Sequence, residues 1–350
     1  MKEHIEDCNL VYSELGDEIS KKIYEARIIY SLTGKDESIR AITDTVPAVQ
    51  KFICKMSEMA PEQPRLIYGA GMRGKTIQRY WKYNWRAFMD HNPELWNTQE
   101  QGLPILSVEE ALNKYHNPVV VVTNRVGFSD IERELVASGK VKKECIINMG
   151  ALWSELTELQ YFDLEVLPHV EREVFVDLGV YDGYSSKMFT EWCHNDFSYI
   201  WAFEPDTINL EVCKEKMRRY FSEKKFNLIN KATWNSVGRM SFARKGFVDS
   251  LLDRTGEELV QVTTLDEELQ GQRVTFIKMD IEGAELETLQ GAEKTIKSNL
   301  PKLAISIYHK PEDIFTIPSL IYQYSDCYMF YLRHYSFFDW DTVLYAVPRK

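Results

Sequence analysis

The chain of 350 residues has little of what marks membrane, secreted or nucleic-acid-binding proteins. No run of about 18 apolar residues occurs, so no membrane span is expected. The opening segment MKEHIEDCNL is acidic and has no apolar stretch, which argues against a signal peptide. With 53 acidic and 42 basic side chains, the formal net charge of −11 disfavours binding to a phosphate backbone. We therefore expect a cytoplasmic protein without a nucleic-acid partner.

Cysteine is also sparse, and no two cysteines have the spacing of a Cys-x-x-Cys motif. Neither a cysteine metal site nor a redox pair is therefore expected. Six reduced, mostly buried thiols suit a cytoplasmic compartment. The sequence has no internal repeat and no low-complexity tract. Its apolar fraction of 44% is sufficient for well-packed cores, and its length predicts two domains.

The first part of the chain predicts helices followed by a small domain. Residues 1–60 have helical periodicity, as in DEISKKIYEARIIYSLTG, where apolar side chains recur at helical spacing until Gly34. Residues 61–150 alternate apolar strands with helical patterns, the strands being in PRLIYG, WRAFMD, NPVVVV and ECIINM. This alternation predicts a small Rossmann-like α/β domain with a parallel sheet.

After a connector at residues 151–171, the alternation starts again and fills residues 172–350. Strands are expected in VFVDLG, YIWAFEPD, FNLIN, VTFIKMD and KLAISIYH, and a single helix is expected in AELETLQGAEKTIKSNL. The last two strands, YMFYLRHY and TVLYAVP, have no helix between them and should pair antiparallel. The predicted fold class is therefore α/β, with a mostly parallel Rossmann-like C-terminal sheet and an antiparallel final strand.

The stretch VFVDLGVYDGYSS predicts a strand, a glycine loop and the start of a helix. It lacks the Gly-Lys-Ser or Gly-Lys-Thr of a P-loop and the third glycine of a dinucleotide loop. Asp177 ends the strand and Asp182 lies in the loop, so two carboxylates would repel a phosphate. S-adenosylmethionine suits such a loop better, because it has an ammonium and a sulfonium. Gly179 and Gly183 would let the loop pass close to it.

The next strand ends in AFEP, which places Glu204 at its carboxyl end. Ligands of open α/β sheets bind at the carboxyl ends of the strands. An ionised carboxylate accepts hydrogen bonds through two oxygens, so Glu204 is predicted to bind both ribose hydroxyls. The alternative is a loop whose glycines only turn the chain, with Glu204 at the surface.

The segment IKMDIEGAELETLQGAEKTI, together with FVDLGVYDGYSS, AFEPD, VTTLDE and ISIYH, resembles the FkbM family of S-adenosylmethionine-dependent methyltransferases. The resemblance covers about residues 172–310, and DIEGAE is its most specific part. The family often has Asn after the small residue of the glycine loop, where this chain has Tyr181 and Asp182.

The resemblance implies a cofactor-binding role for particular residues. Asp177, Gly179 and Gly183, with Asp182 in the same loop, would hold the methionine and adenosyl moieties. The remaining cofactor residues would be Glu204 at the ribose, Ala232 and Thr233 at the adenine, and Asp280 facing the transferring methyl group.

Three side chains are predicted to do the chemistry at the carboxyl edge of the sheet. Asp280 and Glu282 follow one strand, and His309 ends the next. His309 is predicted as the general base, because histidine titrates near neutral pH. The alternative is that Asp280, Glu282 and His309 bind a divalent metal that polarises a hydroxyl. Purely structural roles are a further possibility, with Glu282 capping the following helix and Glu285 serving the helix or solvent.

The N-terminal domain contains a glycine motif of its own. Gly69, Gly71 and Gly74 form Gly-x-Gly-x-x-Gly after a strand, and Asp90 ends the next strand. Taken alone, this pattern predicts dinucleotide binding. The segment FMDHNPELWNTQEQGLPILSVEEAL also resembles small Rossmann-like modules attached to sugar-modifying transferases. Such modules bind a nucleotide-sugar or serve as a platform for homo-oligomers.

The leading hypothesis is therefore an S-adenosylmethionine-dependent O-methyltransferase. Its partner would be a small-molecule or carbohydrate acceptor, such as a sugar, a glycoconjugate or a natural product. One alternative is a nicotinamide-dependent oxidoreductase or a nucleotide-sugar-binding protein that uses the N-terminal glycine motif. Against the oxidoreductase, no Tyr-x-x-x-Lys pair follows at short-chain dehydrogenase spacing. A non-catalytic scaffold is the remaining alternative.

Overall fold

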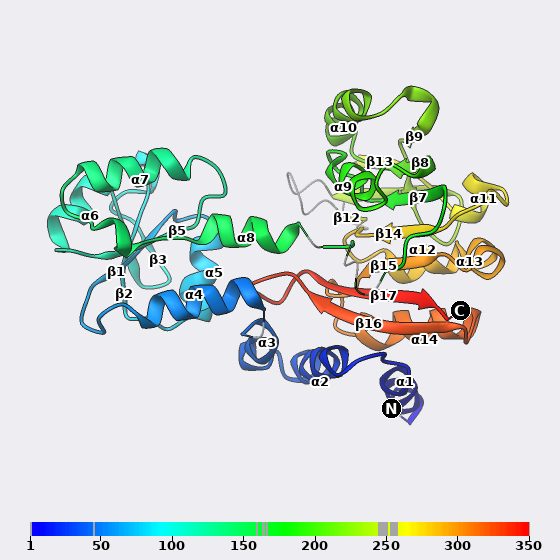
Figure 1. Ribbon diagram of the computed structural model, residues 1–350, viewed down its shortest axis with the longest axis horizontal. Coiled ribbons are helices and arrows are strands. Elements are labelled where there is room, and N and C mark those ends of the chain that lie inside the picture. Colours follow the sequence, from blue (N-terminus) through cyan, green and yellow to red (C-terminus); the bar gives the residue numbers. More distant parts are fainter. Residues whose placement is uncertain are drawn as a thin grey trace. The chain divides into compact units, whose positions relative to one another are not determined.

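The computed structural model describes residues 2–44, 46–158, 160–162, 165, 167–243, 251–252 and 258–349. The chain forms two compact units, each built around its own main sheet (Figure 1). The large unit comprises Met1–Lys35, Leu159–Tyr335 and Trp340–Lys350, and the small unit comprises Asp36–Glu158 and Ser336–Asp339. None of the described helices is long and apolar enough to cross a membrane.

The small unit has a six-stranded sheet in the order β3-β4-β2-β1-β5-β6. Neighbouring strands are parallel except β3 and β4. All residues of β1 and β5 are buried, as is typical of parallel strands covered on both faces. The strands are β1 Arg65–Tyr68, β2 Trp85–Met89, β3 Gln99–Glu100, β4 Leu103–Leu106, β5 Val119–Val122 and β6 Ile146–Asn148. The helices are α3 Asp36–Thr43, α4 Pro47–Ser57, α5 Met72–Tyr80, α6 Val108–Lys114, α7 Phe128–Ala137 and α8 Met149–Thr157, with 3₁₀ turns at Pro93–Leu95 and Lys143–Cys145.

The large unit has a seven-stranded sheet in the order β16-β17-β15-β14-β7-β8-β9. The strands are β7 Glu173–Leu178, β8 Phe197–Phe203, β9 Phe226–Ile229, β14 Phe276–Met279, β15 Lys302–Ser306, β16 Tyr328–His334 and β17 Thr342–Pro348. The five neighbouring strands β15, β14, β7, β8 and β9 are parallel, and β17 is antiparallel to both β15 and β16. This arrangement confirms the predicted mostly parallel sheet with an antiparallel end.

A second, four-stranded sheet and eight helices complete the described part of the large unit. The second sheet has the order β10-β13-β11-β12, with β10 Ala232–Thr233, β11 Gly238–Ala243, β12 Leu251–Leu252 and β13 Glu258–Thr263. The helices are α1 Lys2–Ser13, α2 Glu18–Thr33, α9 Tyr184–Trp192, α10 Thr207–Tyr220, α11 Leu265–Leu269, α12 Glu285–Gln290, α13 Glu293–Asn299 and α14 Asp313–Tyr324, with a 3₁₀ turn at Glu223–Lys225.

An aromatic core holds the central strands of the large sheet against α9. The rings of Phe175 on β7 and Phe189 on α9 stack with their centroids 4.2 Å apart. Phe276 on β14 meets Phe175 edge-on at 5.4 Å, and Trp192 packs on Phe276 at the same distance. Aromatic pairs in these geometries stabilise a core beyond the area that they bury. The core therefore packs β7, β14 and α9 together next to the strand ends, where the predicted site residues begin.

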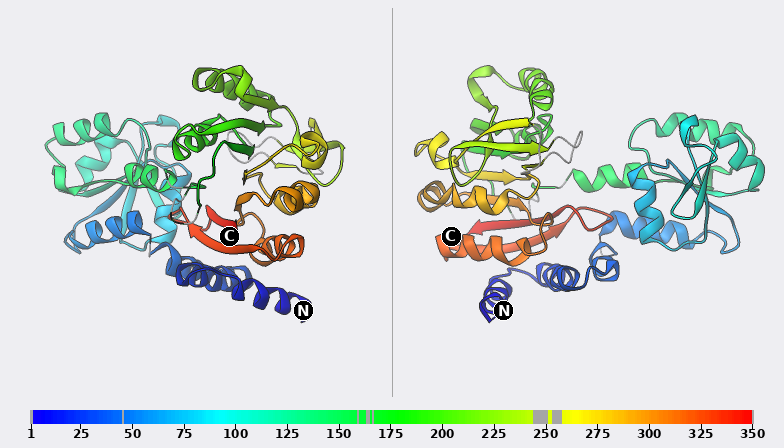
Figure 2. Two further views of the ribbon diagram at one scale, coloured as in Figure 1. Left: turned by 45° about the vertical axis from the view of Figure 1, so that its right-hand side comes forward. Right: turned by 180° about the vertical axis from the view of Figure 1, so that it is seen from behind.

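The predicted helical segment 1–60 is divided between the two units, because α1 and α2 belong to the large unit. Figure 2 shows α2 beside β16 in both views. Ser20 Oγ accepts a hydrogen bond of 2.9 Å from the Leu332 backbone N–H, and Arg333 pairs with Asp17 at 2.8 Å. The helices therefore cover a strand that lies about 300 residues away in the sequence, a pairing that helical periodicity does not reveal.

The prediction of a single helix for AELETLQGAEKTIKSNL is wrong, because this segment forms two helices, α12 and α13. The break lies at Gly291, where an added Cβ would be 2.1 Å from the backbone oxygen of Trp234. The close approach of these two backbone segments requires glycine and interrupts the helix. As a consequence, α12 is short and its first turn lies directly after the DIEG segment.

Candidate functional site

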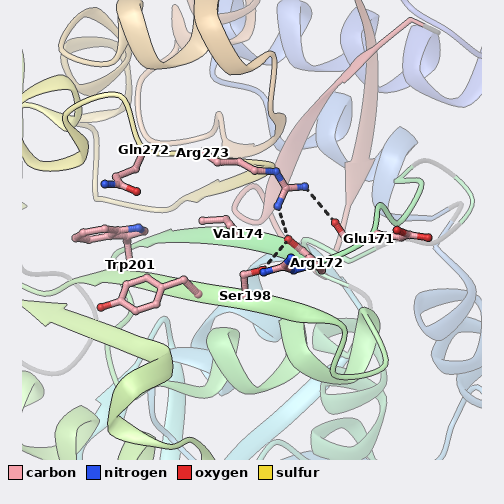
Figure 3. Close-up of a pocket in the computed structure, with 8 residues that line it drawn as sticks. Glu171, Arg172, Val174, Ser198, Trp201, Gln272 and Arg273 are labelled. Carbon is pink, nitrogen blue, oxygen red and sulfur yellow. Dashed lines mark hydrogen bonds between the residues drawn. The ribbon is translucent and has the colours of Figure 1, made fainter.

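A cavity of about 610 Å³ lies at the amino ends of β7 and β8 (Figure 3). Its lining includes Trp201, Tyr199 and Arg273. The Arg273 guanidinium donates hydrogen bonds to the backbone oxygens of Glu171 and Arg172, so its charge is used to hold the chain. None of the predicted site residues lines this cavity. The candidate site is instead at the opposite, carboxyl ends of the strands, where open α/β sheets bind their ligands.

The glycine loop after β7 is organised by Asp177. This side chain is fully buried, and its Oδ2 accepts hydrogen bonds of 2.7 Å from the hydroxyls of Ser185 and Ser186 at the start of α9. Lys278 on β14 lies 3.3 Å from Asp177 Oδ1 and also donates to the backbone oxygen of Gly179 at 2.8 Å. Asp177 therefore ties the strand, the loop and the helix together from inside the protein.

Gly179 is required at its position in the loop. Its φ is +74°, a left-handed conformation that side chains other than glycine rarely adopt. An added Cβ would also lie 1.9 Å from the backbone oxygen of Asp280. The two loops of the predicted site, after β7 and after β14, therefore touch through their backbones. Each loop also has a non-glycine residue at positive φ, Tyr181 at 53° and Glu282 at 56°, and such residues cluster at functional sites.

Glu204 follows β8 and faces the glycine loop. Its Oε2 accepts a 2.9 Å hydrogen bond from the Tyr181 backbone N–H, and its Oε1 accepts one of the same length from the Asp206 backbone N–H. Only 5% of the residue is exposed. Burial raises the pKa of Glu204 to about 7, although both backbone hydrogen bonds oppose the rise. Each oxygen keeps a further lone pair, so the carboxylate can accept two more hydrogen bonds.

The other predicted cofactor residues are in more varied surroundings. Asp182 forms an ion pair with Lys216 at 2.5 Å and accepts a hydrogen bond from the Tyr184 backbone N–H. Gly183 has φ +84°, and an added Cβ would be 3.0 Å from the Met217 side chain. Ala232 and Thr233 form the short strand β10 and are buried.

The hydroxyl oxygen of Thr233 accepts a 3.0 Å hydrogen bond from the hydroxyl of Thr288 on α12. Asn230, which the sequence did not single out, donates to the backbone oxygen of Glu204 at 2.9 Å. Its place directly after β9 was the available signal, because strand ends carry the ligand-facing residues of such sheets.

Asp280 follows β14 and is held by tyrosine hydroxyls. Tyr161 donates a 2.7 Å hydrogen bond to its Oδ2, and Tyr308 donates a 3.4 Å bond to its Oδ1. Burial alone would raise the pKa of Asp280, but the nearby charges of His309 and Lys278 outweigh burial and lower it. Asp280 is therefore ionised at neutral pH. Tyr161 is itself buried, and both burial and the neighbouring Asp280 hold its pKa well above 10.

His309 lies among three carboxylates. Its Nε2 is 3.6 Å from Asp280 Oδ1 and 3.5 Å from Glu282 Oε2, and its Nδ1 is 3.0 Å from Glu285 Oε1. Burial lowers the pKa of His309, but Glu285 first and then Asp280 and Glu282 raise it to about 9. The structure therefore brings the three predicted residues together, but it favours the protonated imidazole, whereas a general base must be neutral.

Glu285 is the site residue that the sequence analysis undervalued. Its side chain is fully buried, and its Oε1 accepts a 2.9 Å hydrogen bond from the Ile281 backbone N–H. Among the described residues, Asp280, Glu285 and His309 have ligand atoms that all lie within 4.8 Å of one another, and Glu282 is not in this group. The described residues that are close enough to hold one ion together therefore include Glu285, whereas the predicted set had Glu282 in its place. The reason is that Glu285 opens α12 and turns back towards the strand ends.

In the small unit, as in the large one, a carboxylate after a strand holds the glycine loop through a backbone N–H. Asp90 follows β2, and its Oδ2 accepts a 2.9 Å hydrogen bond from the Ala70 backbone N–H in the glycine loop. Its Oδ1 accepts a 2.9 Å bond from the Asn92 backbone N–H, two residues further on, as Glu204 does from Asp206. Gly74 is required by packing, because its Cβ would be 2.0 Å from the backbone oxygen of Gly69. In contrast, a Cβ on Gly71 would meet no described atom within 4 Å.

The comparison with protein families decides what this site belongs to. The model of the methyltransferase FkbM domain matches residues 177–343. The chain contains an FkbM methyltransferase domain. This domain begins at Asp177 and includes every residue predicted for the cofactor and for catalysis, from the glycine loop to His309.

One solved structure shows the same fold over most of the chain. The chain is similar to the methyltransferase FkbM from Methylobacillus flagellatus KT, with a TM-score of 0.54 and 19% identity over 94% of this chain and 99% of that chain. A precorrin-6y C5,15-methyltransferase from Geobacter metallireducens GS-15 gives 0.34 and 10%, covering 57% of this chain and 87% of that one. An rRNA methylase from Streptococcus thermophilus gives 0.35 and 13%, covering 56% and 95%. No curated protein matches the sequence.

Proposed function

We propose that the FkbM domain binds S-adenosylmethionine and methylates a hydroxyl group of a small-molecule or carbohydrate acceptor. The observation that carries the proposal is the carboxylate of Glu204, which backbone N–H groups hold in place at the end of β8. Its free lone pairs suit a pair of vicinal hydroxyls, such as those of a ribose. A loop that merely turned the chain would not need a buried carboxylate beside it, because burying a charge is costly.

The residues of the glycine loop also fit this cofactor. Gly179 has a left-handed backbone and no side chain, so no side-chain atom of this residue fills the space at the strand ends. Asp177 fixes the loop through the hydrogen bonds that it accepts from Ser185 and Ser186. The loop has acidic side chains and no phosphate-binding lysine-hydroxyl pair, in keeping with a cofactor that is cationic at one end. When bound, S-adenosylmethionine supplies a methyl group on a sulfonium, which is a good leaving group.

The protein then has to align the acceptor and assist the departure of its proton. Asp280 is ionised and held by the hydroxyls of Tyr161 and Tyr308, so it presents a fixed acceptor for a substrate hydroxyl. His309 and Glu282 lie beside it and would orient further polar groups of the acceptor. This row of charged and hydroxyl groups suits a hydroxyl-rich acceptor such as a sugar, because each group forms hydrogen bonds with hydroxyls.

The experiment that tests the proposal has two steps. Calorimetric titration of the full-length chain with S-adenosylhomocysteine should show one binding site per chain. Sugars, glycoconjugates and polyhydroxylated natural products are then screened for formation of S-adenosylhomocysteine from S-adenosylmethionine. Absence of binding in a folded protein would remove the proposal, and transfer only to amines would remove its O-methylation part.

We expect the affinity for S-adenosylhomocysteine to fall as the pH drops below 7. The reason is that ribose hydroxyls donate to the charged form of Glu204, whose pKa is raised by burial to about 7 in the free protein. Affinity should be fully present above this pKa and about tenfold weaker one pH unit below it. Calorimetry at pH 8, 7 and 6 measures the effect.

The control for this prediction is Glu204→Gln, which cannot titrate. Its amide nitrogen would face the N–H of Tyr181 or Asp206, so affinity should be at least about tenfold weaker at every pH. If the affinity of this variant for S-adenosylhomocysteine depended on pH as that of the wild type does, the assignment of Glu204 to the ribose would be contradicted.

A second candidate function concerns the small unit, where a nucleotide-sugar or dinucleotide would bind the loop Gly69 to Gly74. The observation in its favour is Gly71, because a Cβ added there would meet no described atom within 4 Å. Packing within the described chain therefore does not explain this glycine, whereas close approach of a ligand would. In dinucleotide-binding loops the glycine at this place lets the pyrophosphate approach the backbone. Thermal unfolding separates the two functions, since NADH or a nucleotide-sugar would raise the melting temperature of Asp90→Ala less than that of the wild type. S-adenosylhomocysteine would raise both equally.

A further inference from the structure

A half-buried and a fully buried carboxylate of the FkbM domain share His309 as their nearest cationic partner. Asp280 and Glu285 both lie close to His309, at 3.6 Å and 3.0 Å from its Nε2 and Nδ1. Even a protonated imidazole balances only one of the two charges. The buried Lys278 of the same strand forms its ion pair with Asp177, at 3.3 Å. The pair therefore has excess negative charge, and the part on the fully buried Glu285 lies where water cannot screen it, which is costly unless a cation is present.

Polar atoms in this cluster also lack hydrogen-bond partners. Glu285 is fully buried, and its Oε2 has no hydrogen bond to any described residue. The side chain of His309 is 9% exposed, and neither of its nitrogens has a hydrogen bond of acceptable geometry within the described chain, although Glu285 lies close to Nδ1. Buried polar atoms are nearly always paired in native proteins, so these atoms mark a position where a ligand is missing.

We propose that Asp280, Glu285 and His309 bind one divalent metal ion. One ligand atom from each lies within 4.8 Å of the others. Oxygen and nitrogen ligands at about 2.1 Å from a common ion are roughly 3–4 Å apart, so small side-chain rotations complete the site. Two carboxylates and one imidazole suit Mn²⁺ or Mg²⁺ better than a soft ion such as Cu(I).

The ligands come from elements that the fold holds rigidly. Asp280 directly follows the buried strand β14, Glu285 is the first residue of α12, and His309 follows β15. Glu285 is additionally fixed by the Ile281 backbone N–H through its Oε1, which leaves Oε2 for the metal. Sites whose ligands are oriented by such further hydrogen bonds bind metal more tightly.

The catalytic part of this inference rests on the proposed function. A divalent ion bound by Asp280 would act as a Lewis acid on the acceptor hydroxyl, lowering the pKa of that hydroxyl and aligning its oxygen. Binding of the ion does not depend on the proposed function and is tested by itself.

The test uses the full-length chain, freed of metal with a chelator and dialysed. Titration with MnCl₂, followed by the electron paramagnetic resonance signal of free Mn²⁺, should show one site. Glu285→Gln and Asp280→Asn should each weaken this site by at least about tenfold. The matched control is Glu287→Gln, because Glu287 lies on the same helix, is paired with Lys310 at 3.4 Å and belongs to no part of the site. It should bind Mn²⁺ as the wild type does.

Two results would overturn the metal site: no Mn²⁺ binding by the wild type, or equal binding by the wild type, Glu285→Gln and Asp280→Asn. Circular dichroism and thermal unfolding confirm that each variant is folded. Titration of the same samples with S-adenosylhomocysteine in the presence of chelator keeps the two proposals apart. Binding of S-adenosylhomocysteine without Mn²⁺ binding removes only the metal. Mn²⁺ binding without S-adenosylhomocysteine binding supports the metal and removes the proposed cofactor.

Discussion

We expect Gly179→Ala to lower the free energy of unfolding of the protein by about 2–5 kcal/mol. A left-handed alanine costs about 1–2 kcal/mol, and forcing extra atoms into a packed region costs about 1–3 kcal/mol. Both costs apply, since φ is +74° and the new Cβ would be 1.9 Å from the backbone oxygen of Asp280. The clash pushes apart the two loops of the site, so affinity for S-adenosylhomocysteine should fall at least tenfold as well, since small displacements of a binding loop are costly. Thermal unfolding and calorimetry measure the two effects.

The matched control for this substitution is Gly271→Ala in the same unit. Gly271 has φ +78°, but its Cβ would meet no described atom within 4 Å. It therefore isolates the cost of the left-handed backbone, about 1–2 kcal/mol, and should leave cofactor affinity unchanged. Equal stability of the two variants would show that the close contact between Gly179 and Asp280 does not exist in solution.

We expect Asp280→Asn to reduce turnover by about 10²-fold or more, with the affinity for S-adenosylhomocysteine close to that of the wild type. Loss of a group that positions or deprotonates the acceptor has an effect of this size. Asparagine has the same shape and can still accept the hydrogen bond from Tyr161, so the fold should survive. Turnover is measured with the acceptor identified by the screen, as S-adenosylhomocysteine formed per unit time.

The control is Asp326→Asn, which makes the same chemical change at an exposed position of the same unit. Its turnover should equal that of the wild type. A turnover of Asp280→Asn within tenfold of the wild type would remove Asp280 from the chemistry. A tenfold or larger loss of S-adenosylhomocysteine affinity would instead assign Asp280 to cofactor binding.

The sheets and the residues at the strand ends could be predicted from the sequence. Strands buried on both faces are rich in apolar residues, as in the continuous run of β5, and helices follow them along the chain. Asp177, Glu204 and Asp280 could therefore be assigned to the carboxyl edge by counting along the chain. Pairings between distant segments left no such pattern. The contact of Ser20 with Leu332 and the close approach of Gly291 to Trp234 became visible only in the folded chain.

The details of the site depended on burial, which the sequence did not reveal. Tyr161 lies in the predicted connector, where no periodicity indicates that its hydroxyl binds Asp280. Lys278 did give a signal, since it is the single charge within the otherwise apolar run FIKM. His309 was predicted as a base from the ordinary pKa of histidine, and three neighbouring carboxylates move that pKa upwards. Glu285 was undervalued because helical spacing alone does not show which way the first turn faces.

The division of the chain between the two units determines the order in which a ribosome can complete them. The last strand of the small unit ends at Asn148, but the unit also includes Ser336–Asp339, where Phe337 packs against Trp81 at 6.0 Å and Trp153 at 5.8 Å. Every described strand of the large unit except β17 is therefore synthesised before the aromatic cluster of the small unit can close. At about 5–20 residues per second, the sheet of the nascent small unit waits roughly ten seconds or longer for this segment. We expect its aromatic side chains to stay exposed during this interval, when a chaperone could bind them.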